Sequence, residues 1–99
     1  MRIEFLVAAR EEFLNAASYY DSQEEGLGDE FADEVWKTIS RIVKHPLAWQ
    51  QISSRTRRCL TNRFPYGVIY QAKSDSILII AVMHLHREPK SWRGRVVDE

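Results

Sequence analysis

The stretch FPYGVIYQAKSDSILIIAVMHLH, residues 64–86, decides the fold because it contains two strand patterns separated by a turn. The first pattern, from Tyr66 to Ala72, places Ile69 on one face of a strand. The other face carries Tyr66, Val68 and Tyr70. The second pattern, from Ile77 to His84, is apolar on both faces, which predicts a central strand. The turn-forming sequence at residues 74–76 predicts that the two strands are joined by a short turn.

A further strand is predicted just before this stretch, from about Arg55 to Asn62. The Phe64-Pro65 pair ends it, because proline cannot donate a hydrogen bond to a central ladder. Residues 46–54 are expected to form a loop, with Trp49 and Ile52 held against the body of the protein. Beyond the stretch, the tail from Arg87 to Val97 predicts a short turn of helix or an irregular strap.

The first half of the chain predicts two amphipathic helices, each marked by apolar residues at a 3.6-residue period. The apolar positions are Ala9, Phe13, Ala16, Ala17 and Tyr20 in the first, and Leu27, Phe31, Val35, Ile39 and Ile42 in the second. Gly26 and Gly28 interrupt the pattern, and Pro46 stops the second helix after about Lys44. The short connection predicts an antiparallel helical hairpin. Ahead of the first helix, an apolar face predicts one strand; its members are Ile3, Phe5 and Val7.

These elements predict an α+β fold in the order β-α-α-β-β-β. A helical hairpin packed on one face of a small, mostly antiparallel sheet is the simplest way to bury all the apolar faces. Ninety-nine residues are enough for one core and not for two, so we expect a single domain over residues 1–99.

Charge is divided unevenly along a chain whose formal net charge is zero. Residues 1–50 hold ten acidic and five basic residues, whereas residues 51–99 hold four acidic and nine basic residues. Either the two halves neutralise each other in the fold, or the basic half faces an acidic partner or a nucleic acid. The charged N-terminus, the single Cys59 and the lack of a long apolar run predict a cytoplasmic protein with no membrane segment.

The basic half contains two groups of residues that suit recognition. An arginine cluster lies in and around one predicted strand, and guanidinium groups bind phosphate and carboxylate through two parallel hydrogen bonds; its members are Arg55, Arg57, Arg58 and Arg63. The alternative is an edge strand protected from aggregation by its charge. His84 and His86 share one strand face, which suits acid–base chemistry or a structural hydrogen bond. No metal site is expected, because a third and a fourth ligand are missing nearby in the sequence.

Several segments, taken in order, resemble the ParE/RelE superfamily of bacterial type II toxins, also called plasmid stabilisation proteins. The similar segments are Ala9-Arg10-Glu11-Glu12-Phe13 with Ala16 and Tyr19-Tyr20, Gly28-Asp29-Glu30-Phe31 with Glu34-Val35, Pro46, Arg57-Arg58, Phe64 to Tyr70, and the ending His84 to Pro89 with Trp92 and Arg95. The resemblance covers nearly the whole chain and implies a β-α-α-β-β-β fold. It also implies a cognate antitoxin, acidic and partly disordered, that folds as it wraps the toxin.

The resemblance leaves two activities open. The RelE-like branch cuts mRNA on the ribosome, and its residues here would be Arg58, His84 and Arg87. The chain departs from that branch, because Gly67 stands where a middle-strand arginine is usual and no tyrosine follows Tyr70.

The ParE-like branch inhibits DNA gyrase, and the Phe-Pro-Tyr and His-x-x-Arg-x-Pro-x-x-Trp patterns are closer to it. We therefore predict a gyrase inhibitor without a cofactor, with an mRNA endoribonuclease as the alternative and a non-toxic nucleic-acid-binding module as the third hypothesis. The residues expected to bind the target or the antitoxin are Arg57, Arg58, Arg63, His84, His86, Arg87, Trp92 and Arg95. The assemblies to consider are a homodimer and a heterotetramer with the antitoxin.

Overall fold

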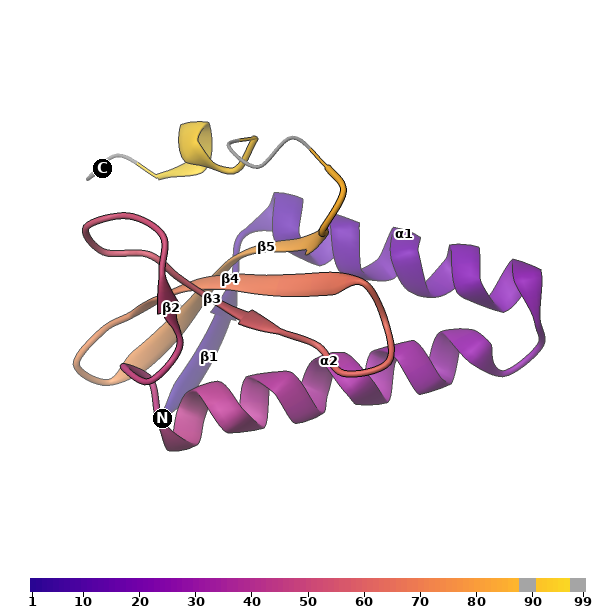
Figure 1. Cartoon of the computed structure of the whole chain (residues 1–99), viewed down its shortest axis with the longest axis horizontal. Helices are drawn as coiled ribbons and strands as arrows, with labels where there is room; N and C mark the ends of the chain where they lie inside the picture. The colour runs from indigo at the N-terminus through magenta and orange to yellow at the C-terminus, as the bar shows by residue number, and fades with distance from the viewer. Residues whose placement is uncertain (88–90, 97–99) are drawn as a thin grey trace.

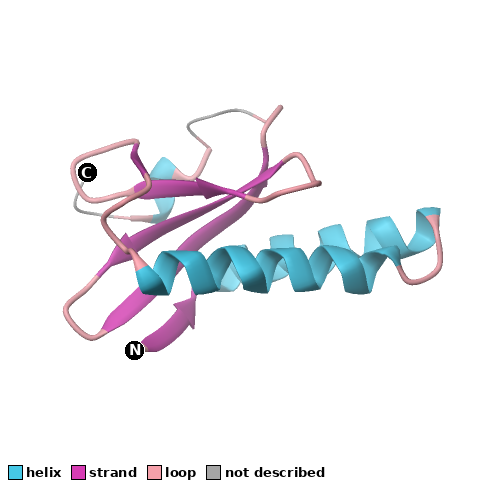
Figure 2. Ribbon diagram, turned by 60° about the horizontal axis from the view of Figure 1, so that its bottom comes forward, coloured by secondary structure: helices cyan, strands magenta, loops and turns pink. Residues whose placement is uncertain are grey.

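A computed structural model describes residues 1–87 and 91–96 of the chain. The regular elements are β1 (Arg2–Phe5), α1 (Val7–Gln23), α2 (Leu27–Lys44), β2 (Gln50–Gln51), β3 (Arg57–Leu60), β4 (Tyr66–Ala72), β5 (Ser76–His84) and a 3-10 turn (Arg93–Arg95). The predicted α+β order is confirmed, with the two-residue strand β2 added inside the expected loop. The helical hairpin and the sheet form two layers (Figures 1 and 2).

The five strands form one sheet in the order β1-β5-β4-β3-β2. Strand β5 lies between β1 and β4, as its two apolar faces predict. It pairs in parallel with β1 and antiparallel with β4. Because β1 is only four residues long, it covers β5 along Ser76–Ile79 and leaves the rest of that edge uncovered by backbone.

The helical hairpin depends on two glycines at its turn. Gly26 has φ +88°, a left-handed conformation that side chains rarely adopt. At Gly28, an added Cβ would lie 2.4 Å from the Ala17 carbonyl oxygen, so only glycine allows this close approach of α2 to α1. The Asp21 carboxylate accepts hydrogen bonds from the backbone N–H groups of both glycines, at 3.0 and 3.3 Å. These contacts fix the angle at which α2 returns along α1.

The main core lies between the hairpin and the sheet and is rich in aromatic rings. Phe31 of α2 is fully buried, and its ring centroid lies 4.9 Å from Tyr66, 5.1 Å from Tyr20 and 5.3 Å from Phe64. Tyr66, Val68 and Tyr70 face this core, as the alternation in β4 predicts. The predicted stripe of α2 is buried at Phe31, Val35, Ile39 and Ile42, with Leu27 partly buried at its start.

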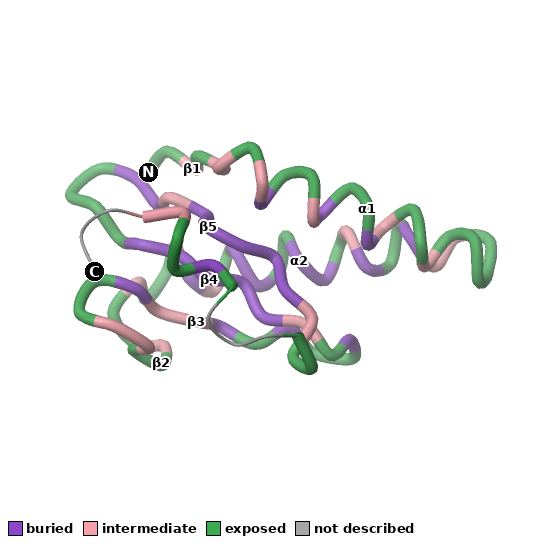
Figure 3. The backbone as a smooth tube through the Cα atoms, turned by 90° about the horizontal axis from the view of Figure 1, so that it is seen from above, coloured by how far each residue is buried: buried purple, intermediate pink, exposed green. Residues whose placement is uncertain are grey.

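A second, smaller cluster lies on the opposite face of the sheet. It consists of Ile69, Ile80, Ala81, Met83 and Trp92. Consecutive residues Ile80 and Ala81 both belong to it because the β4–β5 register shifts between Ile69 and Tyr70, which leaves Ile80 as a bulged residue. Residues 91–96, which we call the strap, cover this face on the side away from α2 (Figures 1 and 3).

Three details of the sequence interpretation are wrong. Val7 is not in the first strand but begins α1 and is 74% exposed, because β1 ends at Phe5. Strand β3 covers only Arg57–Leu60 and is shorter than the strand predicted from Arg55 to Asn62. After Leu60 the chain enters a tight turn, in which the Thr61 N–H donates to the Tyr66 carbonyl oxygen and Arg63 has φ 66°. Residues 46–54 are not all loop, since Gln50 and Gln51 pair with Arg58 and Arg57.

Candidate protein-docking site

A pocket of about 220 Å³ lies on the strap side of the sheet. Strands β4 and β5 form its floor, and its lining residues are Ile52, Arg58, Gly67, Ile69, Met83, His84, Leu85, Arg87, Trp92 and Arg93. Half of these side chains are apolar and four are arginine or histidine. None of the described residues that line it is acidic. We call this hollow the strap-side pocket.

Arg58 is the lining residue with the most constrained position. Its Nη2 donates a 2.8 Å hydrogen bond to Gln50 Oε1, which β2 presents across the strand pair. Its Nε is buried and has no hydrogen-bond partner among the described residues. A buried donor without a partner is costly, so an acceptor that reached this N–H on binding would remove that cost.

Gly67 makes room for the Arg58 side chain. A Cβ added at Gly67 would lie 3.0 Å from Arg58 Cδ and 3.1 Å from Arg58 Cγ. The stem of Arg58 therefore packs closely on Gly67, and a side chain at position 67 would force it to shift by a few tenths of an ångström. The glycine that departs from the RelE-like pattern has a local role, because it lets the neighbouring strand supply the cation.

The two histidines lie at the end of β5, beside the pocket. The His84 ring packs 5.2 Å from the Tyr66 ring and 5.2 Å from the His86 ring. The backbone N–H of His86 donates a 3.1 Å hydrogen bond to His84 Nδ1. Nδ1 of His84 thus acts as an acceptor, which leaves Nε2 to carry the proton of the neutral ring. Burial raises the pKa of the adjacent Tyr66 hydroxyl, so this group stays protonated further into the alkaline range than an exposed tyrosine does.

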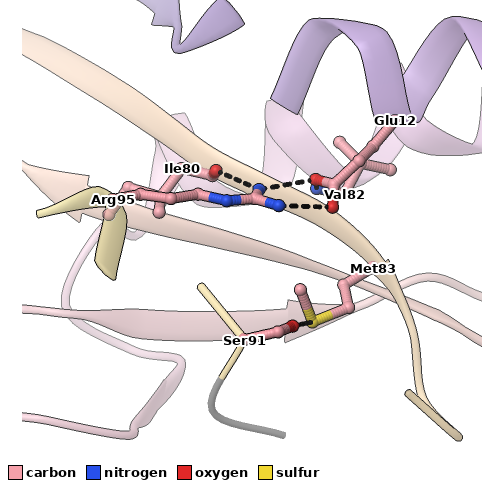
Figure 4. A network of polar contacts seen from close by, with 6 residues as sticks. All are labelled: Glu12, Ile80, Val82, Met83, Ser91 and Arg95. Carbon is pink, nitrogen blue, oxygen red and sulfur yellow. Dashed lines mark hydrogen bonds and ion pairs between the residues drawn. The ribbon is translucent and has the colours of Figure 1, made fainter. Parts of the chain in front are cut away.

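The strap is fastened to the sheet by a polar network that includes Glu12, Arg95 and the backbone of β5 (Figure 4). Arg95 pairs with the Glu12 carboxylate through two bonds of 2.8 Å. The same carboxylate accepts a 3.1 Å bond from the Val82 N–H, and Arg95 donates a 3.0 Å bond to the Ile80 carbonyl oxygen. The hydrogen bonds that Arg95 donates to Glu12 raise the pKa of Arg95. These side chains replace the strand partner that β5 lacks beyond the end of β1.

A wider groove runs beside this network, between α1 and the end of β5. Its volume is about 970 Å³, and its lining includes Glu11, Glu12, Tyr19, Tyr66, His86, Arg87 and Arg95. Tyr19 is 59% exposed on the helical side of the groove. His84 and Arg87 line both the groove and the strap-side pocket, so the two hollows adjoin at the end of β5.

The structure brings together only part of the predicted site. Arg58, His84, Arg87 and Trp92 line the strap-side pocket, while His86 and Arg95 lie in the neighbouring groove. Trp92 is 1% exposed and packs in the second cluster, so its buried ring anchors the strap.

Two predicted residues lie elsewhere. Arg57 pairs in register with Tyr70 and therefore shares the helix-facing side, where its Nη1 donates to the Trp49 carbonyl oxygen at 2.9 Å. Arg63 forms an exposed ion pair of 2.8 Å with Glu30 of α2. Both arginines already have intramolecular acceptors.

Sequence reasoning missed three residues that shape the site. Arg93 stacks on the Trp92 ring, with its guanidinium carbon 5.1 Å from the ring centroid, and lines the pocket. Gln50 orients Arg58, and Glu12 holds the strap. The adjacent Trp92-Arg93 pair offered a usable signal for the first, since arginine often stacks on tryptophan. Nothing local in the sequence marks the other two, because their partners are distant.

Residues 1–87 and 91–96 contain no cluster of three histidine, cysteine or carboxylate residues that could hold a metal ion. Over the same residues, no helix is both long enough and apolar enough to cross a membrane. Cys59 is a buried thiol on the helix-facing side, and burial raises its pKa, partly opposed by a hydrogen bond with Arg41. It is therefore a core residue of β3 and lies apart from the basic surface.

The fold and the basic pocket define a small α+β protein built around a two-faced sheet. Residues 3–89 match the family described as the ParE toxin of the type II toxin-antitoxin system, parDE, and the chain belongs to that family. Among solved structures, it is similar to a chain of the chromosomal ParDE TA system from P. aeruginosa, with a TM-score of 0.63 and 11% identity over 87% of this chain and 97% of that chain. At this identity the likeness concerns the fold. A search of curated protein sequences gives no significant match.

Proposed function

We propose that this ParE-family toxin acts in the cytoplasm as a single domain that inhibits DNA gyrase by protein–protein contact. A cognate antitoxin neutralises it by covering the same surface. The observation that supports the proposal is the convergence of Arg58, His84 and Arg87 on one pocket with apolar walls. An apolar centre with arginine around it is the usual composition of a protein-docking site.

An mRNA endoribonuclease is the second candidate, and the same convergence favours it. Arg58 and Arg87 would hold the scissile phosphate, and His84 would exchange protons with the 2′-hydroxyl or the leaving group. Cleavage needs both a base and an acid in the pocket, and His84 is the only histidine among the described residues that line it. The residues that line the pocket therefore favour docking over RNA cleavage.

The third hypothesis, a non-toxic nucleic-acid-binding module, depended on the arginine cluster acting as one surface. Arg57 and Arg63 are engaged with Trp49 and Glu30, away from the pocket where Arg58 lies. A continuous stripe of free arginines, which backbone binding to nucleic acid requires, is not formed by these three residues.

The test is induction of the chain in a bacterial host, together with assays on purified components. Gyrase inhibition predicts filamentation, a DNA-damage response and loss of supercoiling activity when the purified toxin is added to gyrase. Arrest of translation before any DNA damage, with mRNAs cut within codons, would replace this function with the endoribonuclease. Growth that continues normally after induction, with the folded protein present, would contradict both toxin activities.

Single variants locate the surface. Arg58→Ala and Arg87→Ala should reduce toxicity without loss of the folded circular dichroism spectrum, because both side chains lie at the pocket rather than in the main core. Arg63→Ala is the matched control, since it removes an exposed arginine paired with Glu30. Equal loss of toxicity in all three variants would show that overall charge matters and the pocket does not.

A further inference from the structure

We infer that the strap-side pocket binds a carboxylate with an adjoining apolar group, supplied by an acidic segment of a protein partner. Arg58 holds the carboxylate, and the pocket wall receives the apolar group. The inference deepens the proposed function and rests on it for the identity of the partner, which is the antitoxin or the target protein.

The charge of the pocket selects an anion. Arg58, Arg87 and Arg93 line it together with His84, and no acidic side chain among its described lining residues offsets them. The nearby carboxylate of Glu12 is already engaged by Arg95 through two hydrogen bonds. An anion that enters the pocket therefore meets positive charge that no described lining residue offsets.

The geometry of Arg58 favours a planar acceptor with two oxygens. Its Nη2 is anchored on Gln50, and its buried Nε–H has no partner in the described part of the chain. The Nη group beside Nε–H is Nη2, which has a second hydrogen in addition to the one donated to Gln50, so a carboxylate that reached this edge could accept from Nε–H and Nη2 in two parallel bonds. Binding would then satisfy a donor that is otherwise buried at a cost.

The walls distinguish a peptide carboxylate from a nucleic-acid phosphate. Ile52 and the exposed Leu85 present apolar surface next to the arginines. Ile69, Met83 and Trp92 also line the pocket but are buried. A carboxylate on a folded or folding peptide arrives with apolar neighbours that can occupy such walls, whereas a backbone phosphate is flanked by sugars. At about 220 Å³ the pocket is smaller than the roughly 300–1,000 Å³ of most small-molecule sites, so it suits a side-chain anchor.

The experiment is a titration of the isotopically labelled full chain with small probes, followed by backbone amide NMR. The probes are 3-phenylpropionate, which joins a ring to a carboxylate; 3-phenylpropanamide, its uncharged analogue; and uridine 5′-monophosphate. We expect saturable shifts at Gly67, Met83 and Leu85 with 3-phenylpropionate, and binding at least about tenfold weaker for the amide, since a charged hydrogen bond is lost. Tighter binding of the nucleotide than of 3-phenylpropionate would overturn the inference.

Three variants connect the probe to Arg58. Arg58→Gln should abolish the shifts, and Arg58→Lys, which keeps the charge and removes the Nε–H, should weaken binding by about tenfold or more. Arg57→Gln is the matched control, because Arg57 is the adjacent residue on the opposite side of the sheet. Unchanged binding in Arg58→Gln, with a folded spectrum, would show that the pocket does not use this residue and would overturn the inference.

This test is separable from the proposed function, because it uses neither gyrase nor an antitoxin. If the parent chain inhibits gyrase but does not bind the probe, the inference about the pocket is refuted and gyrase remains the target. If the parent chain binds the probe but has no effect on gyrase, the inference about the pocket stands and the proposed function is refuted.

Discussion

The two faces of the sheet differ in how completely they are filled. The helix-facing side packs fourteen buried residues into one aromatic-rich cluster, with Phe31 and Val35 fully buried. The strap side has a cluster of five buried residues bordered by the pocket. The short strap covers this side (Figure 3). The helical hairpin therefore buries most of the apolar surface and provides most of the stability. The other face is left free to carry arginines at an unfilled hollow.

Truncation in the helix-facing core should have the largest effect. Phe31→Ala should lower the free energy of unfolding by about 3–5 kcal/mol, because the ring touches four other aromatic rings and the cavity cannot close. Urea denaturation followed by circular dichroism measures it. Leu14→Ala, at a residue 57% exposed on α1, is the control and should change stability by less than about 0.5 kcal/mol. Similar losses in both variants would break the comparison.

The corresponding change on the strap side should cost less. Trp92→Ala should lower the free energy of unfolding by about 2–3 kcal/mol, below the usual range for a buried tryptophan, because the strap can relax onto the sheet. Hydrogen exchange should show lost protection at Met83 and unchanged protection in α2. A global loss as large as that of Phe31→Ala would mean that the two faces contribute equally. Trp36→Ala, at a tryptophan 48% exposed, is the control for loss of an indole ring.

The polar fastening of the strap should contribute less again. Glu12→Gln should lower the free energy of unfolding by about 1–2 kcal/mol, since it weakens charge-assisted bonds at a pair whose side chains are 18% and 22% exposed. A double-mutant cycle with Arg95→Gln measures the coupling, which should decrease in high salt. The exposed pair of Arg63 and Glu30 is the control, and Glu30→Gln should cost less than about 0.5 kcal/mol. Equal coupling energies in the Glu12–Arg95 and Glu30–Arg63 pairs would mean that closing the β5 edge does not add to the free energy of unfolding.

The last effect should appear only in alkali, and it reports on the helix-facing side. Burial raises the pKa of Tyr70 to about 12, against the opposing charge of Arg57. The unfolded state then loses this proton near pH 10 while the folded state keeps it, so the free energy of unfolding should fall between about pH 10 and pH 12. Urea denaturation at several pH values measures the slope. The Tyr70→Phe variant also lacks the hydrogen bond to the Pro46 carbonyl oxygen. Its free energy of unfolding should fall less steeply with pH than that of the control variant, Tyr19→Phe.

The fold was predictable because its signals are local. The period of two in β4 and the period of 3.6 in α2 name the residues that face the core, and the structure confirms them at Val68, Tyr70, Phe31 and Ile39. Errors arose where local pattern and tertiary pairing differ. Val7 continued an apolar alternation that the parallel pairing of β1 with β5 ends at Phe5. Gln50 and Gln51 form a strand only because Arg58 and Arg57 lie beside them.

The candidate site was predictable only in part. Strand parity correctly separates Arg57 from Arg58, since neighbouring residues in β3 point to opposite faces. It does not tell which face lies under the hairpin. Arg57 was therefore assigned to binding, although it donates to the Trp49 carbonyl oxygen on the helix-facing side. Trp92 was assigned to the surface because an aromatic tail residue has no local sign of burial, yet its ring is covered by the sheet.

By itself, the sequence determined the elements other than β2, their order and the place of β5 between two strands, because apolar periodicity and turn residues act over a few positions. Only the tertiary structure decided which arginines share a pocket, and that Gly67 yields its space to Arg58. It also decided that Glu12 and Arg95, 83 positions apart, close the edge of β5 at Ile80 and Val82. The physical reason is that these contacts depend on the length of β1 and on the bulge in β5, and both are set by strand pairing rather than by neighbours in the chain.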